Sequence, residues 1–217
     1  MTEQPGRRER KKAATRQKIA DTALRLFAER GYDAVGIREV AAEADVAVTT
    51  LFAHFSSKEA LVFEQDEDFE QRLVKAVTDR EPDAPLIPAL RHEIHAMVRH
   101  CTADGAAPLW QMIEESPALK QYEDAMRLRH ARSLATAIAA DRGLLQSTQN
   151  TQTTTACQAI ARFVIDAFSV AREADDPEAA VDEVFRMIEA AWETSGLAYR
   201  VTDRADAGVE ARAAVAL

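Results

Sequence analysis

Residues 36–59, GIREVAAEADVAVTTLFAHFSSKE, constrain the fold more than any other stretch of this chain. Apolar residues recur at helical spacing over 37–44, and a second short pattern of the same kind covers 48–54. Asp45 stands between the two patterns, where a tight turn needs a residue that tolerates a positive φ. The stretch therefore predicts two short helices joined by a turn, with a third helix that begins near Ser57.

The second short helix would present an unusual face to solvent. Its outward positions carry small, β-branched and aromatic side chains: Val48, Thr49, Thr50, Phe52 and His54. In a DNA major groove, such methyl groups meet thymine methyls and such hydroxyls meet bases or phosphates. Ser56 and Glu59 fit a capping box for the next helix, which would place Lys58 where a phosphate can bind. The pattern favours a helix-turn-helix, and the alternative is a similarly shaped piece of an ordinary helical domain.

Residues 15–63 resemble the TetR family of bacterial transcriptional regulators. TTLFAHFSSKEAL fits the family pattern Thr-Leu-aromatic-x-aromatic/His-Phe-x-x-Lys-Glu-x-Leu, and LRLFAERGYDAVGIREVAAEADV fits the first two helices. Three positions depart from the pattern: Asp45 replaces the turn glycine, Ala47 replaces the Ser or Thr cap, and Phe52 replaces a Tyr. The resemblance implies that double-stranded operator DNA is contacted by Arg38, Ala47, Val48, Thr49, Thr50, Phe52, His54 and Lys58.

The chain carries a net charge of −9, which taken alone argues against a nucleic-acid partner. The distribution reverses that argument, because residues 1–60 carry 11 Lys and Arg against 9 Asp and Glu, while the remainder carries 16 against 27. Basic charge is thus concentrated where the predicted helix-turn-helix lies, as DNA binding requires. We expect residues 1–14 to form a flexible basic arm that reaches a minor groove or neighbouring phosphates; the alternative is a solvated tail.

A chain rich in Ala, Leu, Glu and Arg, with seven glycines and seven prolines in 217 residues, predicts an all-α fold. We expect about nine helices, arranged as a three-helix DNA-binding domain over 15–60 and a ligand-binding and dimerisation domain over 61–200. One long helix over about 57–79 would act as a lever between them, and residues 201–217 would be a disordered tail. The sequence has no apolar run that could span a membrane and no signal-peptide core, so a cytoplasmic location is expected.

Large, adaptable apolar side chains predict a small-molecule pocket in the middle of the chain: Met97, Trp110, Met112, Tyr122, Met126 and Phe163. The alternative is ordinary core packing. The negative charge of this part favours a neutral, cationic or lipid-like ligand. The last two expected helices have broad apolar faces, which periodicity alone assigns to a core as readily as to an interface. The family resemblance implies that they pair with a second copy, with Phe168, Val184 and Ile188 in the dimer interface.

No motif supports enzyme chemistry, because the sequence has no nucleophile elbow, phosphate loop or paired catalytic carboxylates. His92, His95 and His100 share one expected helix but not one face of it, so neither a metal site nor a cofactor is predicted. The sequence predicts a homodimeric DNA-binding transcriptional regulator, a repressor released from its operator by a small apolar or lipid-like ligand. The alternatives are a ligand-independent or activating regulator of the same fold, and a helical protein-interaction module.

Overall fold

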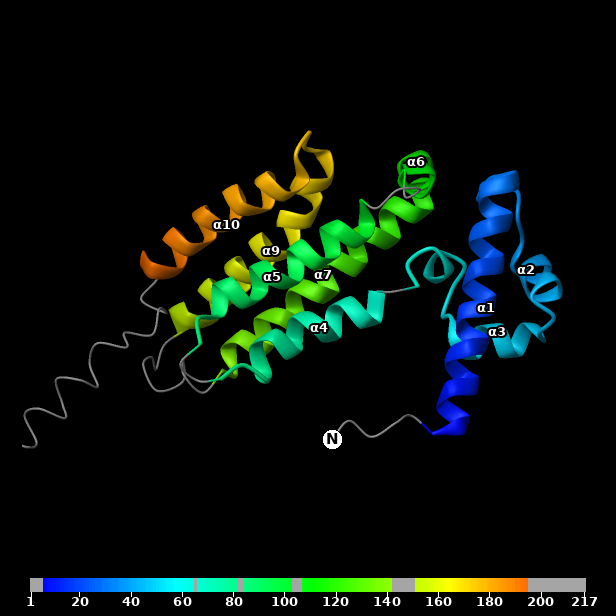
Figure 1. The fold of residues 1–217 in the computed structure, drawn as a ribbon, viewed down its shortest axis with the longest axis horizontal. Helices are drawn as coiled ribbons and strands as arrows, with labels where there is room; N and C mark the ends of the chain where they lie inside the picture. The colour runs from blue at the N-terminus through cyan, green and yellow to red at the C-terminus, as the bar shows by residue number, and fades with distance from the viewer. Residues whose placement is uncertain (1–5, 65, 82–83, 103–106, 142–150, 195–217) are drawn as a thin grey trace, which may run out of the picture. The chain divides into compact units, whose positions relative to one another are not determined.

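The computed structural model describes residues 6–64, 66–81, 84–102, 107–141 and 151–194 (Figure 1). Within these ranges it contains nine α-helices, one short 3-10 helix and no strand, which confirms the predicted all-α class. None of the described helices is long and apolar enough to cross a membrane. The elements in chain order are α1 (Arg7–Arg30), α2 (Ile37–Glu43), α3 (Val48–His54), η1 (Glu59–Leu61), α4 (Asp66–Thr78), α5 (Leu86–Cys101), α6 (Ala107–Glu115), α7 (Pro117–Ala139), α9 (Thr151–Glu173) and α10 (Pro177–Thr194).

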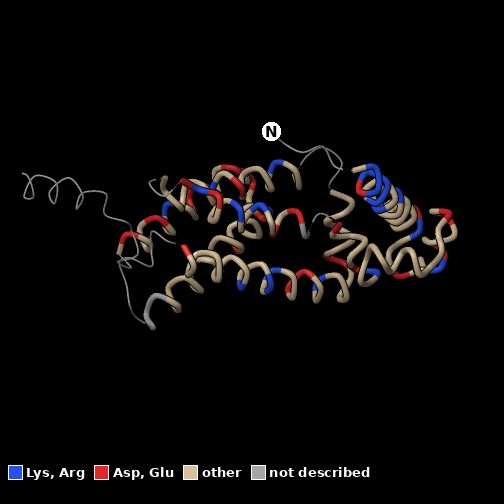
Figure 2. The backbone as a smooth tube through the Cα atoms, turned by 90° about the horizontal axis from the view of Figure 1, so that it is seen from below, with Lys and Arg blue, Asp and Glu red and all other residues tan. Residues whose placement is uncertain are grey.

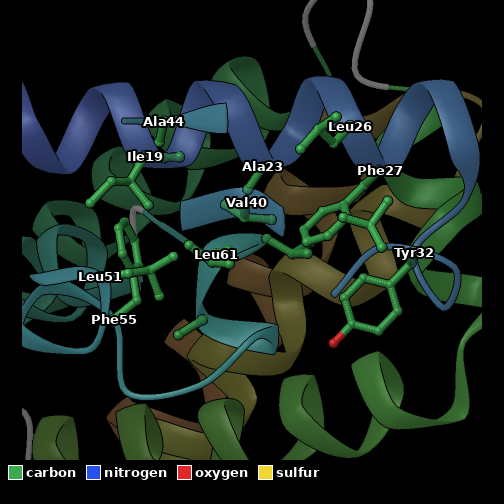
Figure 3. Close-up of a cluster of buried hydrophobic side chains, with 14 of the residues drawn as sticks. Ile19, Ala23, Leu26, Phe27, Tyr32, Val40, Ala44, Leu51, Phe55 and Leu61 are labelled. Atoms are coloured by element: carbon green, nitrogen blue, oxygen red, sulfur yellow. The ribbon is translucent and has the colours of Figure 1, made fainter. Parts of the chain in front are cut away.

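The chain divides into two compact units, residues 1–67 with 102–126 and residues 68–101 with 127–217. The first unit surrounds the predicted helix-turn-helix. Figure 3 shows its core, which α1, α2, α3 and η1 fill with buried apolar side chains, among them Ile19, Ala23, Leu26, Phe27, Tyr32, Val40, Ala44, Leu51, Phe55 and Leu61. Gly31 ends α1 with a φ of 86°, a left-handed value that favours glycine, and its N–H donates to the carbonyl of Phe27 at 2.8 Å.

The turn between α2 and α3 has the predicted geometry. Asp45 has a φ of 52°, the one positive value among the described non-glycine residues. The N–H of Val46 then donates to the carbonyl of Ala41 at 2.9 Å, which closes the turn after α2. Ala47 occupies the N-cap position of α3 without a side-chain hydrogen bond, as expected for a residue that has replaced Ser or Thr.

The first helix begins earlier than the sequence analysis predicted. It starts at Arg7 instead of about Thr15, so the expected flexible arm is helical from Arg7 onward; residues 1–5 and the predicted tail 201–217 lie outside the described residues. The N–H of Gly6 donates to Oε2 of Glu9 at 2.9 Å and begins the helix. Arg, Lys, Ala and Glu dominate the next eight positions, and these residue types have high helix propensity.

The predicted lever helix over 57–79 is also different in the structure. The chain forms only the short η1, then a turn over 62–64, and α4 starts at Asp66. Instead of the predicted capping box of Ser56 and Glu59, this stretch has a hydrogen bond from the N–H of Ala60 to Oγ of Ser57 at 3.3 Å. The carbonyl of Glu64 accepts from Arg16 at 2.7 Å, and the acidic run that follows it places like charges four residues apart, which disfavours a continuous helix.

The first unit extends beyond the predicted domain 15–60 to include α6 and the start of α7. Ile113 and Leu119 are buried in the same core as the helix-turn-helix. The rings of Phe63 and Tyr122 stack at a centroid distance of 5.4 Å and an interplanar angle of 21°. These contacts tie the turn after η1 to α7 within one compact unit.

The second unit is a helical body in which α5, α9 and α10 pack against one another. Three ion pairs run along α5 and α10: Arg91–Glu189 at 3.8 Å, His95–Asp182 at 2.9 Å and Arg99–Glu178 at 3.9 Å. Helix α4 is joined to α7 where Ser133 donates to Glu70 at 2.5 Å. A nearly buried pair, Arg80 with Asp141 at 2.5 Å, links the residues that follow α4 and α7.

Candidate nucleic-acid interface

Helix α3 presents the face that the sequence predicted for DNA. Leu51 is fully buried on its inner side, while Thr49 is exposed and the side chain of Phe52 is 50% exposed. Ala47 is exposed, Thr50 and His54 are half-buried, and Arg38 on α2 is exposed. A half-exposed Phe on a short helix costs solubility, which is consistent with a surface that meets a partner.

Val48 is the member of the predicted set that turns partly inward. Its side chain is half-buried and packs against the core of the first unit. It contributes to holding the start of α3 in place, and its remaining exposed surface lies beside Ala47. The outer face of α3 is therefore formed by the exposed Thr49, Phe52 and Ala53, with the half-buried Thr50 at its edge.

Arg16 fixes the other end of α3. From α1 its guanidinium donates to the carbonyl of His54 at 2.5 Å and to that of Glu64 at 2.7 Å. It also lies 4.3 Å from the centroid of the Phe55 ring. The last carbonyls of a helix lack partners within the helix and carry partial negative charge, so a cation here both satisfies and stabilises the helix end.

Lys58 lies differently from the sequence prediction, which placed it outward on a helix N-terminus. Its Nζ donates to the carbonyl of Tyr32 at 2.5 Å and sits 4.0 Å from the centroid of that ring. Burial lowers the pKa of Lys58, although Asp33 and Glu59 oppose the shift. The lysine thus holds the residues after α3 against Tyr32, and its ammonium group has further N–H donors besides the one bound to that carbonyl.

Tyr32 and Glu59 complete this half-buried cluster. The Tyr32 hydroxyl donates to Oε1 of Glu59 at 2.9 Å. Burial and then this bond raise the pKa of Tyr32. Burial alone would raise the pKa of Glu59, but hydrogen bonds from Ser57, from its own backbone and from Tyr32, together with the charge of Lys58, hold it below its ordinary value. The cluster fastens the residues after α3 onto the end of α1.

Two contacts that hold the end of α3 were not predicted from the sequence: the bond from Arg16 to the His54 carbonyl and the bond from Tyr32 to Glu59. Arg16 had a usable signal, since it is a charged residue three positions before Ile19, at the edge of the apolar stripe of α1. The Tyr32–Glu59 bond joins residues 27 positions apart, and no local pattern reveals such a pair.

The residues predicted to line a ligand pocket do not come together as one set in either unit. Trp110, Met112 and Tyr122 pack against the core of the first unit. Met126 also belongs to the first unit, whereas Met97 and Phe163 belong to the second, where Phe163 is 52% exposed. The alternative of ordinary core packing therefore fits Trp110, Met112 and Tyr122.

A groove of about 490 Å³ lies between α7 and α9 in the second unit. Three alanines spaced four residues apart on α7, Ala131, Ala135 and Ala139, belong to its lining. Arg132 and Arg162 add two guanidinium groups, one from each helix. The remaining lining residues are Leu128, Thr136, Ala140, Thr154 and Gln158.

Two of the three residues predicted for a dimer interface are buried within the chain itself. Phe168 is 9% exposed and Ile188 is 2% exposed, while Val184 is half-buried. The large apolar side chains that α9 and α10 do expose are Phe163, Val170 and Met187. On α9, Phe168 lies five positions after Phe163 and therefore on a different face of the helix. On α10, the exposed Met187 directly precedes the buried Ile188 and also lies on a different face.

The described part of the chain holds no group of three or more His, Cys, Asp or Glu side chains placed to bind a metal ion. His95, one of the three histidines considered in the sequence, pairs with Asp182, and that contact lowers the pKa of the Asp182 carboxyl. His95 thus joins α5 to α10.

Comparison with known proteins agrees with this geometry. Residues 19–64 match the family described as bacterial regulatory proteins, tetR family. The HTH-type transcriptional repressor Rv3405c of Mycobacterium tuberculosis H37Rv is 29% identical over 143 residues, which cover 64% of this chain and 75% of that protein. The HTH-type transcriptional repressor KstR of Mycolicibacterium smegmatis is 44% identical over 66 residues, covering 30% of this chain and 31% of that one.

Solved structures show the same fold. The SmeT–triclosan complex superposes with a TM-score of 0.56 at 18% identity and covers 82% of this chain and 91% of SmeT. The TetR family repressor AlkX from Dietzia sp. strain DQ12-45-1b gives 0.55 at 20% identity and covers 82% and 97%. With its exposed α3 face, the helix-turn-helix of residues 19–64 is therefore similar to the matching part of TetR-family transcriptional regulators, and the solved structures share the fold of the chain.

Proposed function

We propose that this chain is a cytoplasmic homodimeric repressor that binds an operator through α3 and is released by a small apolar or lipid-like ligand. The exposed outer face of α3 carries the proposal. Thr49 and Phe52 are exposed on it, and Arg16 fixes its far end by a hydrogen bond to His54. A recognition helix needs both properties, since base edges are read only from a helix held in one orientation.

The contacts divide into two classes. Thr49, Thr50 and Phe52 face base edges, where methyl, hydroxyl and ring contacts discriminate sequence. Arg38 binds a backbone phosphate from α2, and Lys58 binds another through the N–H donors that the Tyr32 carbonyl does not take. The two helix-turn-helix elements of a dimer would enter successive major grooves, roughly 34–36 Å apart.

A direct experiment is selection of an operator from random duplex DNA with the full-length protein, followed by fluorescence anisotropy. Thr50→Ala should weaken binding to the selected operator more than binding to scrambled DNA, because it removes a base contact. Arg38→Ala should weaken binding to the operator and to scrambled DNA about equally. It should also lower the slope of log affinity against log salt concentration, the salt slope, by about one per protomer. Equal losses for the two variants on both DNAs would contradict the assigned docking.

The α7–α9 groove is the proposed ligand site. Its volume of about 490 Å³ lies in the range of small-molecule sites. The alanines offer apolar surface, and the two arginines favour a ligand that adds one acidic or polar group to an apolar body. A relative in fold, SmeT, was solved with triclosan, a small molecule, which supports the class of ligand proposed here.

Filling the groove tests this site. Ala135→Trp should abolish the thermal shift caused by a ligand found in a screen, while operator affinity without ligand stays within about tenfold, or about 1.4 kcal/mol. Ala179→Trp, at an exposed position of α10 outside the groove, is the matched control and should keep the ligand response. A ligand that still acts on Ala135→Trp binds elsewhere.

A further inference from the structure

The first half of α1 has no role in the core. Residues 7–18 contribute no buried side chain, and the first buried one is Ile19. Twelve residues of α-helix extend for about 18 Å. Figure 1 shows the first turns of α1 continuing past α3. Something other than apolar packing must account for a regular helix here.

This segment is strongly basic. Arg7, Arg8, Arg10, Lys11 and Lys12 are all exposed, and Figure 2 shows Lys and Arg gathered on α1. Glu9 is the one acidic residue of residues 7–18, and it accepts the N–H of Gly6. Like charges one turn apart destabilise a helix by a few tenths of a kcal/mol per pair. A polyanion bound alongside the helix would attract these Lys and Arg side chains and offset their mutual repulsion.

Two of these charges lie on the face of α1 that carries Arg16. Arg8, Lys12 and Arg16 follow one another at intervals of four and therefore share one face of α1. Arg16, the last of the three, is bound to the C-terminal carbonyl of α3. Burial, and then the positive charges of Lys12 and Arg16, lower the pKa of His54 at the end of α3.

Helix dimensions decide which part of the DNA these residues can reach. An α-helix with side chains is about 10–12 Å across. The minor groove of B-DNA is about 6 Å wide, so it admits an extended arm but not this helix. The sequence-based option of a flexible arm in the minor groove therefore does not apply to residues 7–12, and the phosphates on the groove edges are the groups within reach.

We infer that Arg8 and Lys12 bind DNA backbone phosphates that flank the groove occupied by α3, extending the contact beyond the base-reading helix. The inference rests on the proposed function, since it requires α3 to be docked on DNA. Because phosphates carry no sequence information, the contact adds affinity and salt dependence without changing the preferred sequence. Arg8 precedes Arg16 by eight residues, about 12 Å of helix, so at about 3.4 Å per base pair the contact adds up to about four base pairs to the DNA length needed on each side.

The test uses the full-length protein, the selected operator, and the same operator lengthened by about five base pairs at each end with arbitrary sequence. Arg8→Ala/Lys12→Ala is compared with Arg7→Ala/Lys18→Ala, which removes the same charge from a different face of the same helix, turned by about 110°. Alanine has the highest helix propensity, so α1 should stay helical, which circular dichroism checks.

The wild type should bind the longer duplex about tenfold more tightly than the shorter one at low salt. Arg8→Ala/Lys12→Ala should lose that gain and lower the salt slope by about two per protomer. Arg7→Ala/Lys18→Ala should keep the gain in affinity and the salt slope of the wild type. Equal behaviour of the two double variants, or no gain from the longer duplex, would overturn the inference. A wild type that does not distinguish the operator from scrambled DNA would instead overturn the proposed function.

Discussion

The guanidinium group of Arg16 in α1 donates a hydrogen bond to the main-chain carbonyl of His54, the last residue of α3, at 2.5 Å. The same group reaches the carbonyl of Glu64, so one side chain fixes both the recognition helix and the turn where the predicted lever helix is interrupted. The orientation of α3 thus depends on a residue that lies outside the helix-turn-helix itself.

Arg16→Ala should destabilise the first unit by about 2 kcal/mol, because it leaves two half-buried carbonyls without a charged donor. Arg16→Lys should recover only part of this, since an ammonium group cannot span both carbonyls with the geometry of a guanidinium. Chemical denaturation followed by circular dichroism measures the loss. Gln17→Ala, at an exposed neighbouring position, is the control and should change stability little.

Asp45 is held at a φ of 52°, where an L-residue is strained and glycine is not. Asp45→Gly should therefore raise the stability of the first unit by up to about 1 kcal/mol, the relief of backbone strain exceeding the greater entropy of an unfolded glycine. Asp45→Ala keeps the strain and should show no such gain. A thermal melt in which Asp45→Gly is less stable than the wild type would show that the Asp side chain contributes more than its backbone strain costs.

Acid should weaken the first unit through Glu59. Its pKa is lowered in the folded chain, so its contribution to stability is present above the ordinary Glu pKa of 4.5 and is lost as pH falls through the lower folded value. Urea unfolding from pH 7 down to pH 3 should show this loss. Glu59→Gln should be less stable at pH 7 and should lose less on acidification; a parallel pH dependence for both proteins would exclude Glu59 as a source.

The apolar residues that α9 and α10 expose should form the homodimer contact. Phe163 and Val170 lie seven residues apart on one face of α9, and both are about half exposed. Val170→Glu should give a folded monomer in sedimentation velocity, since it puts a charge into the apolar contact. Ile188→Glu, at a buried position, should instead unfold the body. A wild type that sediments as a monomer would contradict this prediction.

Local patterns predicted much of this molecule. The all-α class, the positive φ of Asp45 and the exposed face of α3 follow from residue spacing over a few turns, which sequence records directly. The start of α1 was misplaced because a basic, polar stretch was read as a tail, although its residues favour helix. The prediction of one long lever helix was wrong because the tertiary contacts of Arg16 and Phe63 favour a turn at 62–64.

The candidate site divides in the same way. The outward residues of α3 were predictable from helical periodicity. The contact of Lys58 with Tyr32 joins residues 26 positions apart, on either side of α2 and α3, and no local pattern records it. Which apolar residues of α9 and α10 face the core was not predictable either. Both helices are apolar on more than one side, so composition does not decide between Phe168, which is buried, and Phe163, which is exposed.

The central claim is that α3, anchored by Arg16 beside the basic first half of α1, reads DNA, and operator affinity as a function of salt tests it most directly. The measurement is fluorescence anisotropy of the full-length protein on the selected operator and on a scrambled duplex of equal length, at several salt concentrations. The account predicts about a thousandfold tighter binding to the operator, with Thr50→Ala reducing that ratio and Arg8→Ala/Lys12→Ala reducing the salt slope on both duplexes. Equal affinity for the two duplexes at every salt concentration would contradict it.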